Sequence, residues 1–118
     1  MRRAREAGVH VQAAISPTMP HDLDRFAELL EGAADRVVVD TFMGDGAGGR
    51  RTAHRPLPAR LAALGYGSWR DTSAAEALYA RLRERFGPER AGWSQAGFNA
   101  LAVIAQRERL GEPAWTPL

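Results

Sequence analysis

Apolar residues form two short runs, at residues 10–15 and 37–39. Between these runs, apolar residues recur at the spacing of a helix. The first run, His10–Ile15, ends at Ser16-Pro17, where proline lacks an N–H and disfavours helical geometry at the residue before it. The second, Val37–Val39, has no polar member, which is typical of a strand covered on both faces in a parallel sheet. Between the two runs, a stripe recurs every three or four residues after a cap at His21 or Asp22: Leu23, Phe26, Ala27, Leu30 and Ala33. The pattern predicts an α/β fold with parallel strands, built on a right-handed βαβ unit over residues 1–49.

Further helices are predicted at 2–7, 58–64, 73–86 and about 94–110. Gly8 follows the first at a C-cap position, and Ser73 and Glu76 have the spacing of a capping box at the start of the third. Residues 50–72 are predicted to be an irregular connector and residues 73–118 a C-terminal helical extension. The three segments are expected to form one structural unit.

Two parallel strands make a poor sheet, because more strands are normally needed for independent stability. Three explanations stay open. Later segments of the chain add strands, another chain supplies them, or these residues are the C-terminal part of a longer α/β protein. The predicted helix at 2–7 is too short to stand alone, so we expect the chain to open partway through a repeating helix–strand pattern. On this interpretation Val37–Val39 needs neighbours that the chain does not fully provide, and a missing barrel half or self-association supplies them.

Composition narrows the chemistry. The 118 residues allow one ordinary domain, and the chain has no cysteine, which excludes disulfides, a thiol nucleophile and a cysteine-ligated iron–sulfur cluster within it. All 16 basic residues are arginine, but the formal net charge is only +2, so a basic nucleic-acid patch receives little weight. Neither a membrane-spanning run nor the apolar stretch of a signal peptide is present, and we therefore expect a cytoplasmic location and no membrane partner.

Candidate chemistry lies where the two strands end, because parallel strands open onto the same edge of the sheet. Asp40 and Asp45 follow the second strand, where α/β enzymes keep acid/base or ribose-binding carboxylates; the alternative is that Asp40 caps nearby backbone N–H groups. Ser16 and Thr18 follow the first strand. A serine nucleophile is disfavoured, since no histidine base lies nearby in sequence.

A glycine-rich segment, Gly44–Gly49, fits G-x-G-x-x-G after a strand. The residues after it do not open an amphipathic helix, so a flexible strand-exit loop is favoured over a dinucleotide site. Contact of Arg50 and Arg51 with an anion stays open. His10, His21 and His54 lack metal-ligand spacing and are predicted to face solvent or to cap, and no metal site is predicted. The tryptophans are interpreted as packing residues rather than base-stacking platforms: Trp69, Trp93 and Trp115.

Four segments, 14–22, 34–41, 44–46 and 93–99, resemble the C-terminal part of radical S-adenosylmethionine (radical SAM) proteins, in the group related to spore photoproduct lyase. The similarity covers most of the chain but includes no diagnostic catalytic motif. It implies a partial (β/α) barrel of TIM type and lyase chemistry of a DNA-repair kind, with S-adenosylmethionine and a [4Fe–4S] cluster as cofactors of the complete protein. Ser16, Pro17 and Thr18 then match a late strand end near the adenosyl group. The substrate-side candidates are Asp40, Asp45, Arg50 and Arg51.

The three-cysteine motif that defines this family is absent from the chain. We therefore expect a C-terminal fragment that holds no cofactor and is not catalytic alone, with nucleic acid as a partner of the complete protein. Two alternatives stay open. One is a small α/β ligand-binding module that dimerises, and the other is an arginine-rich nucleic-acid-binding domain.

Overall fold

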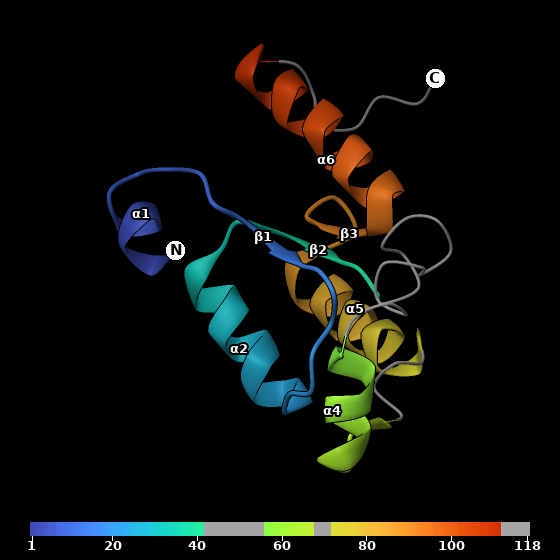
Figure 1. The fold of residues 1–118 in the computed structure, drawn as a ribbon. Coiled ribbons are helices and arrows are strands. Elements are labelled where there is room, and N and C mark those ends of the chain that lie inside the picture. The colour runs from blue at the N-terminus through green and yellow to red at the C-terminus, as the bar shows by residue number, and fades with distance from the viewer. Residues whose placement is uncertain (42–55, 68–71, 112–118) are drawn as a thin grey trace.

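A three-stranded parallel sheet lies at the centre of the computed structural model, which describes residues 1–41, 56–67 and 72–111 (Figure 1). Its order is β1 (Gln12–Ile15), β2 (Arg36–Val39), β3 (Ala91–Trp93). Ala13 of β1 lies beside Val37 of β2, and Val38 lies beside Gly92 of β3. The predicted α/β class and the parallel βαβ unit are confirmed.

The helices are close to those that the sequence predicts: α1 (Arg2–Glu6), α2 (Leu23–Ala33), α4 (Leu57–Ala63), α5 (Thr72–Phe86) and α6 (Ser94–Arg109). Asp22 is the N-cap of α2, where its side chain accepts a hydrogen bond from the Arg25 amide at 2.9 Å. The predicted capping box is wrong in placing Ser73 at the N-cap, because Ser73 lies inside α5 rather than ahead of it.

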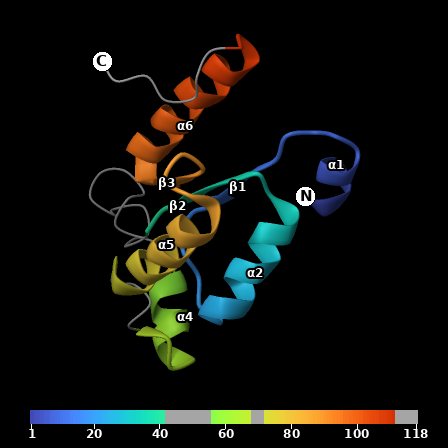
Figure 2. The ribbon, with the colours of Figure 1, turned by 180° about the vertical axis from the view of Figure 1, so that it is seen from behind.

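Helices α2 and α5 cover one face of the sheet and α6 covers the other, as the two opposite views show (Figures 1 and 2). Val37 and Val39 pack in the larger core with Ala27 and Leu30 of α2 and with Leu78 and Leu82 of α5. Val38 points to the opposite face, where it packs with Leu101 and Ile104 of α6. Side chains alternate across a strand, so a central strand with helices on both sides needs apolar residues at every position.

The expectation that Val37–Val39 lacks neighbours in its own chain was wrong. Strand β1 pairs with one edge of β2 and strand β3 with the other, so both partners come from the same molecule. Residues 73–118 are consequently more than a helical extension, since they contribute β3 to the sheet. Within the described residues, β1 and β3 are the two outer strands of the sheet, and each has one edge without a strand beside it.

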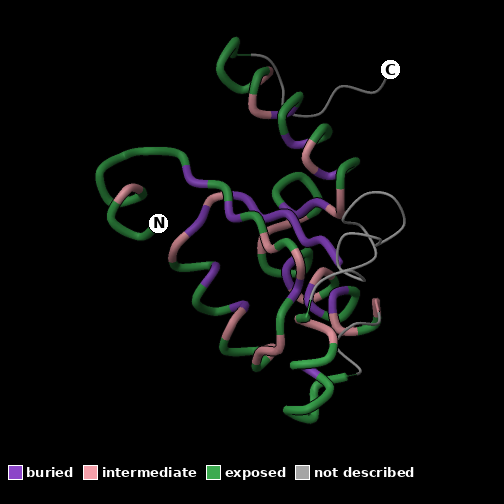
Figure 3. Tube along the Cα trace, viewed as in Figure 1, coloured by how far each residue is buried: buried purple, intermediate pink, exposed green. Residues whose placement is uncertain are grey.

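Helix α6 approaches β3 through two glycines. A Cβ built on Gly97 would lie 2.6 Å from the carbonyl carbon of Gly92, closer than any side chain allows. The helix lies over β2 and β3 and leaves Gln12 and Ala14 of β1 exposed, so the second face of the sheet is only partly covered (Figure 3). Among the helices of the described ranges, none combines the length and apolar content that crossing a bilayer requires.

Candidate functional site

The ends of β1 and β2 meet at one edge of the sheet, as their parallel pairing requires. Thr18 joins them: its amide and its hydroxyl both donate to the Asp40 carbonyl oxygen, at 3.0 and 2.7 Å. The Ser16 hydroxyl donates to Oδ2 of Asp40 at 3.4 Å. The structure thus brings together three of the residues singled out from sequence, Ser16, Thr18 and Asp40.

The Asp40 carboxylate acts on the backbone of its own chain. Its Oδ1 accepts a hydrogen bond from the Thr41 amide at 2.8 Å, which is the capping role considered as the alternative to catalysis. Asp40 and Thr18 are both buried, so neither presents a polar group freely to solvent. Asp45, Arg50 and Arg51 lie outside the described residues, as do the segment Gly44–Gly49 and several residues weighed earlier: His54, Trp69 and Trp115.

A cleft of about 480 Å³ opens beside the end of β1, and Ser16 and Pro17 form part of its wall. Phe26 of α2 and the His21 ring, whose centroids lie 5.1 Å apart, form another part. Nδ1 of His21 lies 2.7 Å from the Met19 carbonyl oxygen, which holds the ring against the loop. The volume lies within the range of small-molecule sites, and the wall is mainly apolar with one serine hydroxyl.

The donor set of this chain does not fit an iron–sulfur cluster, because cysteine thiolates are the ligands such clusters require and the chain has none. Within the described ranges no three histidine or acidic side chains gather in a way that could hold a metal ion. The cleft beside Ser16 and Pro17 fits an organic ligand instead, since it offers apolar walls and the Ser16 hydroxyl.

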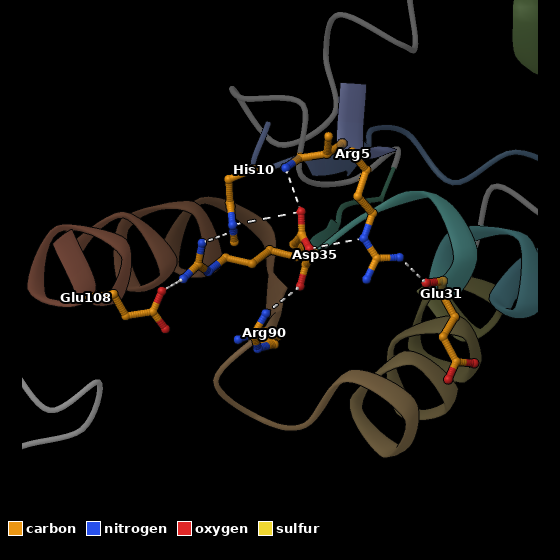
Figure 4. Close-up of polar contacts among 8 residues, drawn as sticks. Arg5, His10, Glu31, Asp35, Arg90 and Glu108 are labelled. Atoms are coloured by element: carbon orange, nitrogen blue, oxygen red, sulfur yellow. Dashed lines mark hydrogen bonds and ion pairs between the residues drawn. The ribbon is translucent and has the colours of Figure 1, made fainter. Parts of the chain in front are cut away.

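A second polar cluster lies at the opposite end of the strands, where β1 and β2 begin (Figure 4). It was not predicted from the sequence. Asp35, just before β2, accepts hydrogen bonds from the Val11 amide at 2.9 Å and from Nε of Arg5 at 3.1 Å. The Val11 hydrogen bond, with the nearby His10 and Arg5, holds the pKa of Asp35 below its ordinary value, although partial burial opposes the shift. Asp35 therefore ties α1 to the start of β1 and β2.

Arg36, the next residue, is only 2% exposed. Its Nη1 contacts Nε2 of His10, and its Nη2 contacts Oε2 of Glu108 near the end of α6. His10 faces solvent as expected, with its side chain 49% exposed, and it also contacts this buried cation. The sequence did carry one signal: Arg36 is the only charged residue in a strand that is otherwise made of valines.

Comparisons with known protein families, with curated proteins and with solved structures found no match. The function is therefore argued from the residues and their geometry.

Proposed function

We propose that this chain forms the late strands of a partial (β/α) barrel in a radical SAM protein of the spore photoproduct lyase-related group. In its complete form the protein acts on nucleic acid, and the chain is not catalytic alone. The observation that carries the proposal is the strand-end arrangement. Ser16 and Pro17, which belong to the segment that resembles the family, line a cleft at the edge of the sheet where parallel α/β folds bind ligands.

The open edge of β1 also supports the proposal. The carbonyl groups of Val11 and Ile15 accept hydrogen bonds from residues 35, 36 and 40, so the alternate residues Gln12 and Ala14 direct their backbone groups away from β2. Their side chains are exposed as well. A preceding strand would pair with this edge and extend the sheet beyond β1.

The roles follow from the resemblance. Ser16 and Pro17 would contact the adenosyl group of S-adenosylmethionine, and Thr18 fixes the strand end beside them through its hydrogen bonds to the Asp40 carbonyl oxygen. The resemblance assigns Asp40, Asp45, Arg50 and Arg51 to the substrate side, and the last three of these lie outside the described residues. The cluster that supplies the radical is held by cysteines of another part of the complete protein.

A binding titration tests this assignment on the chain as it exists. Because the cysteine-held cluster is absent, the chain alone should not hold S-adenosylmethionine stably. We expect only weak, unsaturated amide shifts at Ser16, Thr18 and Thr41 in NMR spectra when the ligand is added in excess to the ¹⁵N-labelled chain. Ser16→Tyr fills the cleft mouth and is expected to abolish the shifts. Gln12→Tyr puts the same side chain on an exposed position of β1 that does not line the cleft, and it should bind normally. Absence of shifts at these amides, or equal loss in both variants, would overturn the proposal.

A dimerising α/β ligand-binding module is the second candidate, and one observation favours it. Both neighbours of β2 come from this chain, so the sheet has a core without any missing strand. Sizing chromatography separates the candidates: a well-folded dimer that persists on dilution supports the module, whereas a loosely packed monomer that aggregates or associates only as its concentration rises supports a barrel segment.

A further inference from the structure

Arg36 is a buried cation with too few acceptors. Its side chain shares a face of β2 with Val38, two residues on, which is the face that α6 covers. A guanidinium carries five N–H donors. In the structure Nη1 contacts His10, Nη2 contacts one oxygen of Glu108, and the buried Nε has no partner. Buried N–H groups without acceptors are costly, so further oxygens at this guanidinium would be stabilising.

A hollow of about 450 Å³ lies next to this guanidinium. Its wall combines the start of β1, the start of β2 and the last turns of α6: His10, Arg36, Ala102, Ala105, Glu108 and Arg109. Three of these side chains are basic and one is acidic. The two alanines are small, which leaves room for a ligand of several atoms between the basic groups.

Glu108 is the one acidic group of the wall, and it is poorly anchored. Its side chain is 36% exposed, it sits one residue before the end of α6, and only its Oε2 contacts Arg36. A free phosphate or carboxylate can place two oxygens against one guanidinium, which gives a stronger and more directional contact than a single oxygen.

We propose that this hollow is a binding site for a small oxyanion, a phosphate group or a carboxylate, and that Glu108 occupies the ligand's place on Arg36 in the unliganded chain. The ligand binds Arg36 through two oxygens and also approaches Arg109, while Glu108 swings into solvent. The site lies at the opposite edge of the sheet from Ser16 and Asp40, so it does not depend on the function proposed above.

Substitution of Glu108 tests the proposal, because removing its charge should strengthen ligand binding, whereas most substitutions in a binding site weaken it. Glu108→Gln removes the competing charge and is expected to tighten binding of inorganic phosphate about tenfold, the effect of one charged hydrogen bond. Glu84→Gln makes the same charge change on an exposed site of α5 and should leave the affinity unchanged. Arg109→Gln, on the hollow wall, is expected to weaken binding several-fold. This variant avoids Arg36, whose replacement could prevent folding.

Binding is read from the Nε–H signal of Arg36 and the amide of His10 in NMR titrations at constant ionic strength. Inorganic phosphate, acetate and adenosine 5′-monophosphate are compared, so that a free anion, a carboxylate and an organic phosphate are distinguished. Equal affinity of Glu108→Gln and wild type, or the same shifts with chloride, would overturn the proposal. Phosphate binding that Ser16→Tyr leaves intact would show that this site stands independently of the strand-end cleft.

Discussion

Ionisation of Asp35 affects the fold, because its carboxylate joins α1 to the starts of β1 and β2. Folding lowers its pKa below the ordinary value of 3.8, chiefly through the hydrogen bond from the Val11 amide. Its stabilising contribution is therefore complete above pH 3.8 and is lost as the pH falls through the folded-state pKa. Asp35→Asn should lower the free energy of unfolding by about 1 kcal/mol at pH 7, a value kept small by solvent screening. In urea titrations, the difference in unfolding free energy between the variant and wild type should shrink below pH 3.8. A difference that does not depend on pH would contradict the assignment.

Also at the scale of single residues, substitution of Gly97 tests how closely α6 approaches β3. A Cβ there meets the backbone of Gly92, which cannot move aside as a flexible side chain can. We expect Gly97→Ala to lower the free energy of unfolding by about 1–3 kcal/mol, the range for overpacking. Gly32→Ala in α2 is the matched control, since its Cβ meets only the end of the Arg2 side chain at 3.8 Å. That variant should gain about 0.5–1 kcal/mol from helix propensity, and equal effects in thermal unfolding would argue against the close approach.

At the scale of elements, α2 depends on its first turn, where Asp22 satisfies the Arg25 amide. Asp22→Ala should cost about 1 kcal/mol of unfolding free energy, the usual effect of losing an N-cap. Asp22→Asn keeps an acceptor oxygen in the same place and should restore most of the loss. Chemical denaturation of the three proteins checks this, and an asparagine variant as unstable as the alanine variant would show that the charge, rather than the cap, matters.

The elements also show what sequence reasoning can reach. Helix α2 and strand β2 were predictable because local patterns determine them: a stripe from Leu23 to Ala33, and an uninterrupted valine run. The proximity of Ser16, Thr18 and Asp40 followed from the rule that parallel strands end at one edge. Strand β3 was missed because Ala91–Trp93 is three residues long and has no alternation, and its place is set by packing against β2. The Arg36–Glu108 contact joins residues 72 positions apart and depends on how α6 crosses the sheet, which no local pattern encodes.

At the scale of the whole molecule, the edge of β1 is one of the two outer edges of the described sheet through which the chain can meet other strands. Its outward backbone groups at Gln12 and Ala14 are a template for pairing, and such edges associate unless charges or proline block them. We expect the isolated chain to self-associate through β1 as its concentration rises in sedimentation velocity experiments. Ala14→Lys should suppress this, because two introduced ammonium groups would face each other across a paired edge.

Ala80→Lys, on an exposed position of α5, adds the same charge away from the sheet and should leave the association unchanged. A wild-type chain that stays monomeric at every concentration, or equal association of both variants, would rule out pairing through β1. In a complete barrel the preceding strand occupies this edge, so the same association should be absent from a longer protein that contains that strand. The comparison therefore also distinguishes a barrel segment from a dimerising module, because only the module keeps β1 as its natural interface.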